Sequence, residues 1–168
     1  MSPRMARLVA AGVTLRDQLN ERFPKRDKRS DGWIGNAEHA SRASDHNPDR
    51  KGWVKALDID EDFGAPGDAE RFATQLVEYC RAGLDHGRVQ NIVYENRVAS
   101  GTFRDTFWVW RKDTKLGHTN HIHISFTAKA DVDGRPFNLP IFASGQAPAK
   151  KAPAKKAPAK KTTPKAKP

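Results

Sequence analysis

The sequence KALDID at residues 55–60 places apolar and acidic side chains alternately along the chain. A period of two is typical of a β-strand, because successive side chains of a strand point to opposite faces of the sheet. Leu57 and Ile59 would share one face, and Asp58 and Asp60 the other. We therefore expect a half-buried strand with two carboxylates on its polar side.

The sequence HIHISF at residues 121–126 has the same alternation. Its isoleucines and phenylalanine would face the core, while His121, His123 and Ser125 face the opposite way. This strand would therefore have a polar face that carries two imidazoles.

Two further strands are predicted at residues 91–95 and 106–110, joined by a polar turn around Ser100 and Gly101. The second of them would carry Trp108 and Trp110 on one face. Large aromatic side chains in such positions usually form core or the wall of a cleft.

Apolar residues at intervals of three and four predict two helices. The first contains Leu15, Leu19 and Phe23, stops before Pro24, and has a capping box formed by Thr14 and Asp17. The second is capped by Asp68 and ends near Gly83 or Gly87, with an apolar stripe formed by Phe72, Ala73, Leu76, Val77 and Cys80.

These elements predict an α+β domain with a small, mainly antiparallel sheet and flanking helices. Residues 25–52 separate the first helix from the first strand and show no sustained period. They are rich in Asp, Asn, Ser, Arg and Gly, so we expect a long irregular loop. Loops of this length are often functional.

The charge of the chain is concentrated at its C-terminal end. The chain has 168 residues and a net charge of +10, and the eight lysines after residue 146 stand without an acid, which leaves 10 − 8 = +2 for the rest. The tail repeats APAKK at 147–151, 152–156 and 157–161. Such a segment cannot bury a core. We expect a catalytic domain at residues 1–143 and a disordered basic tail at residues 144–168.

The cysteine content and the length of the apolar runs limit which metal sites and which cellular locations the sequence allows. The only cysteine is Cys80, which rules out zinc sites made of cysteine pairs. The apolar run at residues 8–15 is shorter than a membrane span and resembles no signal peptide. We therefore expect a protein without a membrane span that accumulates in the cytoplasm of the cell that makes it. We also expect a monomer.

The two polar strand faces would bring carboxylates and imidazoles together if the strands are neighbours in one sheet. His46, in the loop that precedes the first of these strands, would add another imidazole. Nitrogen and oxygen ligands with one open position are what a catalytic zinc ion needs. Bound zinc would activate water for amide hydrolysis. Alternatively, the acids are simply the solvated side of an edge strand.

Three runs in this order carry a resemblance to a known family: SDHNPD at 44–49, ALDI at 56–59 and HIH at 121–123. They resemble the zinc peptidases that comprise D-alanyl-D-alanine carboxypeptidases and L-alanyl-D-glutamate endopeptidases, whose metal fold is shared with hedgehog signalling domains. Catalytic domains of phage endolysins are most similar. The resemblance spans roughly residues 10–130 and excludes the tail.

The resemblance implies that His46, Asp58 and His123 bind zinc. It implies that His121 is catalytic, either taking a proton from the zinc-bound water or stabilising the tetrahedral intermediate, and then helping to protonate the leaving amine. His118 would support it.

Ser44 and Arg42 are expected to contact substrate. Asn120 stands where some relatives have an acid, and an amide cannot act as a base. The long link between His46 and Asp58 also leaves Asp60 as a rival ligand.

The resemblance implies an endolysin that acts on the cell wall after release and hydrolyses the stem peptides of peptidoglycan. The basic tail would bind anionic wall polymers or nucleic acid by long-range attraction. Two alternatives stay open. One is a metal-dependent nuclease, because Asp45-His46-Asn47 faintly resembles a His-Asn-His motif. The other is a non-enzymatic protein that binds polyanions through its tail.

Overall fold

The computed structural model describes residues 5–36, 41–115 and 117–143. Within them the chain forms an α+β domain around a five-stranded sheet in the order β3-β7-β4-β5-β6, in which every neighbouring pair is antiparallel. Its strands are β3 (Ala56–Asp60), β4 (Val89–Tyr94), β5 (Arg97–Ser100), β6 (Arg111–Lys112) and β7 (His121–Phe126). The predicted fold class is therefore confirmed at this level.

A separate two-stranded parallel sheet precedes the main sheet in the chain. It is formed by β1 (Arg7–Leu8) and β2 (Trp53–Val54), so the start of the described chain lies beside the entry to β3. No helix in the described ranges combines the length and the apolar character that a bilayer crossing requires.

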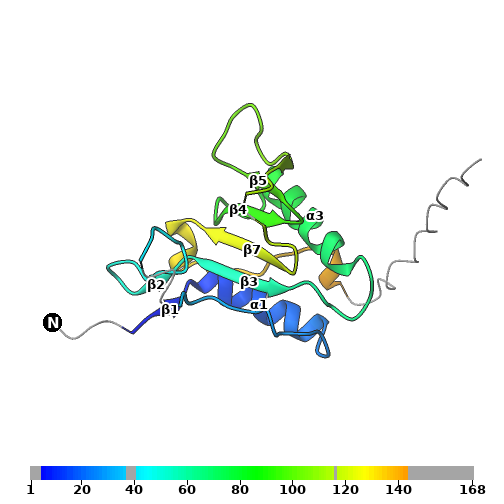
Figure 1. Ribbon diagram of the computed structural model, residues 1–168, viewed down its shortest axis with the longest axis horizontal. Coiled ribbons are helices and arrows are strands. Elements are labelled where there is room, and N and C mark those ends of the chain that lie inside the picture. The colour runs from blue at the N-terminus through cyan, green and yellow to red at the C-terminus, as the bar shows by residue number, and fades with distance from the viewer. Residues whose placement is uncertain (1–4, 37–40, 116, 144–168) are drawn as a thin grey trace, which may run out of the picture.

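The helices α1 (Ala10–Arg22) and α3 (Asp68–Arg81) lie behind the sheet in the view of Figure 1. Two 3-10 turns, η1 (Ala128–Asp131) and η2 (Pro140–Phe142), pack beside them. The apolar stripe predicted for α3 is buried, including Cys80, which is 1% exposed. The opposite face of the sheet is left for polar side chains.

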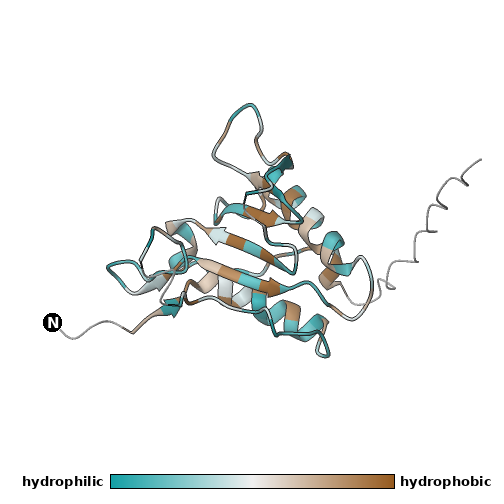
Figure 2. Ribbon diagram, viewed as in Figure 1, coloured by the Kyte–Doolittle hydropathy of each residue, from teal (hydrophilic) through white to brown (hydrophobic). Residues whose placement is uncertain are grey.

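The alternation predicted for the two polar strands is confirmed. Figure 2 shows apolar and polar residues alternating along β7. Ile122 and Ile124 are fully buried in the core with Leu57 and Ile59 of β3. Burying these side chains stabilises the fold by about 1.5–3 kcal/mol each.

The strand predicted at residues 106–110 is wrong. The partner of β4 is β5, reached through a two-residue turn at Glu95 and Asn96, both of which have positive φ. This is the geometry of a type I′ hairpin, whose twist matches that of the strands. Residues 106–110 are irregular, and their only described pairing is an isolated bridge between Ser100 and Phe107.

Trp108 is held in place by tertiary contacts rather than by a ladder. It has a φ of 52° and is 3% exposed, and its carbonyl accepts hydrogen bonds from the side chain of Arg81. Trp110 packs against the same core and is partly buried. The expectation that these aromatics form core is correct, although the strand is not.

The capping box predicted at Thr14 and Asp17 is also wrong, because α1 begins one turn earlier, at Ala10. Thr14 lies inside the helix, and its hydroxyl donates to the carbonyl of Gly134. At α3 the N-cap is Gly67, whose φ is 85°, and Asp68 is the first helical residue. The positive φ explains why glycine stands at this position.

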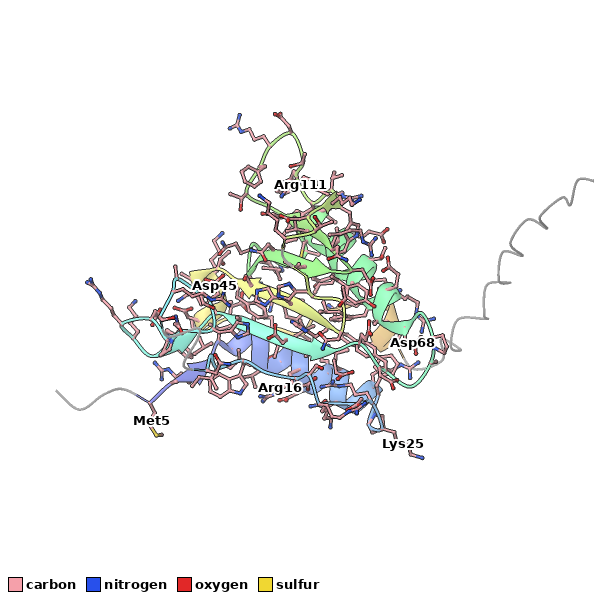
Figure 3. All side chains as sticks on the ribbon, viewed as in Figure 1. Met5, Arg16, Lys25, Asp45, Asp68 and Arg111 are labelled. Carbon is pink, nitrogen blue, oxygen red and sulfur yellow. The ribbon has the colours of Figure 1, made fainter. Side chains whose placement is uncertain are left out.

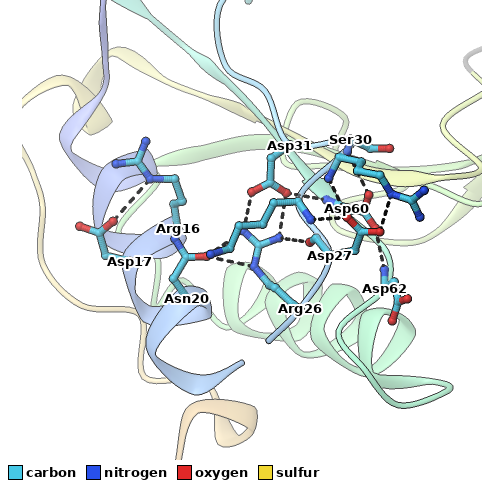
Figure 4. A network of polar contacts seen from close by, with 11 residues as sticks. Arg16, Asp17, Asn20, Arg26, Asp27, Ser30, Asp31, Asp60 and Asp62 are labelled. Atoms are coloured by element: carbon cyan, nitrogen blue, oxygen red, sulfur yellow. Dashed lines mark hydrogen bonds and ion pairs between the residues drawn. The ribbon is translucent and has the colours of Figure 1, made fainter. Parts of the chain in front are cut away.

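The loop that precedes β3 is irregular, as predicted, and a buried polar network fixes it (Figure 4). Arg26 donates to Asp31 at 2.8 Å and to Asn20 at 2.9 Å. The Asp60 carboxylate accepts hydrogen bonds from the backbone amides of Ser30 and Asp62. The network holds the loop along the free edge of β3.

Gly32 continues this attachment with two backbone hydrogen bonds to Asp58. Asp58 N–H donates to the Gly32 carbonyl at 2.7 Å, and Gly32 N–H donates to the Asp58 carbonyl at 3.1 Å.

The described structure reaches the end of the predicted domain at residue 143. The predicted disordered tail, residues 144–168, lies outside the described residues.

Candidate metal centre

Asp58 and His123 are paired across β3 and β7. Antiparallel pairing places directly opposite residues on the same face of a sheet, within reach of each other's side chains. Asp58 Oδ1 lies 2.8 Å from His123 Nδ1. The register of the two strands therefore sets the first half of the site.

His46 reaches the same carboxylate from the loop. Its Nε2 is 3.2 Å from Asp58 Oδ2, and its side chain is 9% exposed. Nδ1 of the ring lies 3.1 Å from the carbonyl of Trp33. Since a carbonyl only accepts, Nδ1 carries the proton and Nε2 presents its lone pair to the centre. The backbone of His46 is fixed as well, because its carbonyl accepts from the amide of Gly35.

These three residues could hold a metal ion. One potential ligand atom from each of His46, Asp58 and His123 lies within 4.8 Å of the others. Two imidazole nitrogens and one carboxylate oxygen suit zinc, and they also suit other divalent transition metals. A carbonyl orients one of the imidazoles, which is typical of metal-binding histidines. The donor set and its support therefore fit a metal centre.

The carboxylate also determines the electrostatics of the centre. Burial disfavours the charged form of Asp58, but the hydrogen bonds and charges of His123 and His46 outweigh it and hold the pKa of Asp58 far below 3.8. Burial likewise opposes protonation of His46, yet the hydrogen bond and charge of Asp58 raise its pKa above 6.5. Without a metal, the carboxylate of Asp58 therefore stabilises the protonated form of His46.

His121 lies at the edge of the centre, on the same face of β7 as His123. Its Nε2 is 3.8 Å from Asp58 Oδ1, and its Nδ1 is 2.7 Å from Asn120 Oδ1. Burial lowers the pKa of His121 below its ordinary value of 6.5. The ring is therefore neutral near pH 7, a state in which one nitrogen accepts protons.

His118 also joins the cluster. Its ring centroid is 4.7 Å from that of His121 and 5.1 Å from that of His123. His118 has a φ of 56°, a conformation uncommon outside glycine, and its carbonyl accepts from the amide of Glu95 at the hairpin turn. The turn between β4 and β5 therefore holds the segment that carries it.

Asp60, the rival ligand, is not part of the centre. Its carboxylate is occupied by the amides of Ser30 and Asp62, as described above. The alternative of a solvated edge strand is excluded for Asp58, whose side chain is 20% exposed and contacts three histidines. The spacing of Asp58 and Asp60 in the sequence could not show which of them faces the histidines. The loop distinguishes them, because it brings His46 to Asp58 and the amide of Ser30 to Asp60.

The centre lies in an open cleft of about 480 Å³, whose lining includes both predicted substrate contacts. Arg42 is exposed on the rim. Ser44 is partly buried, and its Oγ accepts from the amide of His46 at 3.3 Å. Ser44 therefore also shapes the loop that presents the histidine.

Sequence reasoning missed several residues of this cleft. Asn91 and Val93 of β4 and Val98 of β5 line it beside the histidines. Ser125 and Asp45 were visible in the patterns that identified the site, yet received no role. Two features of the sequence could have identified them as part of the site: the alternation of β7 places Ser125 on the same face as His123, and Asp45 directly precedes His46.

No protein-family model matches the chain, and no curated protein and no solved structure matches it.

Proposed function

We propose that the chain is a zinc-dependent peptidase that hydrolyses peptide bonds in the stem peptides of bacterial peptidoglycan, acting as a phage endolysin with a hedgehog-like metal fold. The observation that carries the proposal is the convergence of His46, Asp58 and His123 in one open cleft. The family resemblance of the motifs supplies the substrate. The family resemblance also supplies zinc as the metal, and nitrogen and oxygen ligands in a cleft open to water suit it.

Bound zinc would supply a Lewis acid that polarises the scissile carbonyl and lowers the pKa of water to about 7. His121 is the group that moves protons. Asn120 Oδ1 accepts from its Nδ1, so the lone pair of Nε2 is directed toward the centre. From there Nε2 accepts the proton of the attacking water and delivers it to the leaving amine.

Asn120 therefore has a part in the proposal although it cannot act as a base. It orients the ring of His121, much as a carboxylate or carbonyl orients a catalytic histidine elsewhere. His118 packs edge-on against that ring and restricts its rotation. At the position where some relatives have an acid, this chain has Asn120, and in the proposal His121 takes over the role of the base.

The cleft fits an extended peptide better than a duplex nucleic acid. The acidic residues that line it are Asp45 and Asp58, and Arg42 is the one arginine or lysine among the described lining residues. Binding of a phosphate backbone depends on several cationic contacts. The nuclease alternative therefore has little support in this cleft.

The proposal is tested with purified peptidoglycan, incubated with the protein in the presence and absence of a zinc chelator. New amino and carboxyl termini, identified by mass spectrometry, should appear only with metal and return when zinc is added back. Asp58→Asn protein serves as the matched control and should release none. Zinc-dependent nicking of plasmid DNA without peptide release would favour the nuclease, and no product from either substrate would overturn the proposal.

A further inference from the structure

A hydrogen-bond chain leads from the loop to the histidine ligand on β7. Ser125 Oγ donates to Asp45 Oδ2 at 2.8 Å, and the same Oγ lies 3.0 Å from His123 Nε2. Ser125 is 1% exposed, so this hydroxyl is shielded from water. Figure 3 shows Asp45 beside β7, next to the site face of the sheet. We call Asp45, Ser125 and His123 the relay.

The direction of each hydrogen bond follows from counting protons. A carboxylate has no proton to donate, so the single hydroxyl proton of Ser125 goes to Asp45. The serine oxygen must then accept from His123, which places the ring proton on Nε2. Nδ1 is left to face Asp58, at 2.8 Å from Oδ1.

The other histidine is held in the opposite way. The carbonyl of Trp33 takes the Nδ1 proton of His46 and leaves Nε2 for the centre. The two imidazoles thus approach Asp58 through different nitrogens, and each depends on an acceptor on its outer side. For His46 the acceptor is backbone, whereas for His123 it is a pair of side chains that substitution can remove.

The relay also ties the loop to the sheet. Asp45 directly precedes His46, and its carbonyl accepts from the amide of Lys55 at the entry to β3. Its carboxylate reaches across to β7. The residue therefore connects the segment that carries one proposed ligand with the strand that carries another.

We propose that Ser125 and Asp45 are positioning residues that fix Nδ1 of His123 as the metal-binding nitrogen and hold the loop ligand against the strand. This inference rests on the proposed metal centre. Outer hydrogen-bond partners of metal-binding histidines typically contribute about 10–100-fold in metal affinity.

The first test measures zinc affinity by competition with a chromophoric chelator, using the full chain. Ser125→Ala and Asp45→Ala should each weaken binding by about 10–100-fold. Asp45→Asn should lose less, because its amide oxygen still accepts from Ser125. Ser100→Ala is the matched control: Ser100 is also a buried serine of the sheet, but its hydroxyl bonds to Gln90 and Thr102. It should leave the affinity unchanged.

A second measurement needs no variant. Long-range ¹H–¹⁵N NMR correlations of the zinc-loaded protein should show His123 coordinated through Nδ1 and protonated at Nε2. Coordination through Nε2 would overturn the relay. So would wild-type affinity in Ser125→Ala and Asp45→Ala proteins, and in that case the peptidase proposal would stand.

If wild-type protein binds no zinc, both proposals fail together. Ser125 is buried, so Ser125→Ala protein could lose zinc by failing to fold. Asp45 is exposed, so the Asp45 variants should keep the fold and still test the relay. Circular dichroism checks this for each variant.

Discussion

Asp58 and His123 stand directly opposite each other on β3 and β7, with Oδ1 of the aspartate 2.8 Å from Nδ1 of the histidine. The pairing register alone brings these two side chains together. A slip of one residue would turn one of them to the apolar face, where Ile122 and Ile124 are buried. The metal centre and the hydrophobic core are therefore specified by the same register.

Asp58 and Asp60 should behave differently when each is changed to asparagine. Asp58→Asn removes a proposed ligand, so zinc affinity should fall by more than the roughly 10–100-fold typical of an outer partner. Asp60→Asn should keep the affinity but lower the free energy of unfolding by about 1–3 kcal/mol, because the partly buried hydrogen bonds from the amides of Ser30 and Asp62 lose their charged acceptor. Chelator competition and urea denaturation measure the two effects. Loss of zinc in the Asp60→Asn protein alone would show that the wrong aspartate has been chosen.

Stability of the metal-free protein should be greatest in mildly acidic solution. The folded-state pKa of Asp58 lies below 3.8, so its contribution is present above that pH and is lost as the pH falls further. The folded-state pKa of His46 lies above 6.5, so its contribution is present below 6.5 and is lost as the pH rises through the raised value. The two contributions overlap between these limits.

Urea denaturation of zinc-free protein at about pH 5.5 and about pH 8.5 tests this window. Wild type should be more stable than the Asp58→Asn variant at the lower pH, and the difference should shrink at the higher one. Zinc should bind more tightly at the higher pH, because metal replaces protons on the imidazoles. A difference between wild type and variant that does not change with pH would contradict the raised pKa of His46.

His121→Ala protein should bind zinc normally and cleave slowly. Removing a group that transfers protons usually costs about 10²–10⁴-fold in kcat. Asn120→Ala should lose less, since the imidazole remains but is poorly oriented. His86→Asn provides a control, because His86 is an exposed histidine in the turn between α3 and β4, outside the lining of the cleft, and asparagine tolerates its positive φ. Equal losses in the His86 and His121 variants would remove the catalytic role.

Arg26 should matter more to stability than its surface neighbour Arg29. The Arg26 side chain is fully buried beside Asp31, and Arg26→Ala would leave that acid without its buried partner, at a cost of about 3–5 kcal/mol. Arg29 pairs with Asp27 but its side chain is 88% exposed, so solvent screens the pair and Arg29→Ala should have much less effect on the free energy of unfolding. Thermal or urea unfolding compares the two. Similar losses would mean that the network in Figure 4 does not anchor the loop.

The basic tail should act on binding rather than on chemistry. Deleting residues 146–168 removes eight positive charges and should reduce sedimentation with purified walls at low salt. Cleavage of a small soluble peptide should be unchanged, because no proposed catalytic residue lies in the tail. The wild-type advantage should disappear at high salt. A deletion that impairs wall binding and peptide cleavage equally would argue against a separate attachment role.

Local patterns were sufficient wherever one face of an element is buried. The two-residue period predicted β3 and β7, and the spacing of apolar residues predicted α3. The pattern misled at residues 106–110, where Trp108 is buried through contacts with α3 rather than through a ladder. The Glu95-Asn96 turn was missed because its sequence lacks the glycine that usually marks a type I′ hairpin.

The sequence by itself determined which side chains are available for chemistry: an alternating strand must present Asp58 and Asp60 together, and another must present His121, His123 and Ser125 together. Only the tertiary structure decided which of them meet. The β3–β7 register placed Asp58 opposite His123. The loop brought His46 to the same carboxylate, and the amide of Ser30 in that loop bonded to Asp60 instead. Contacts between residues far apart in the chain depend on how loops and strands pack, and a local pattern carries no record of that packing.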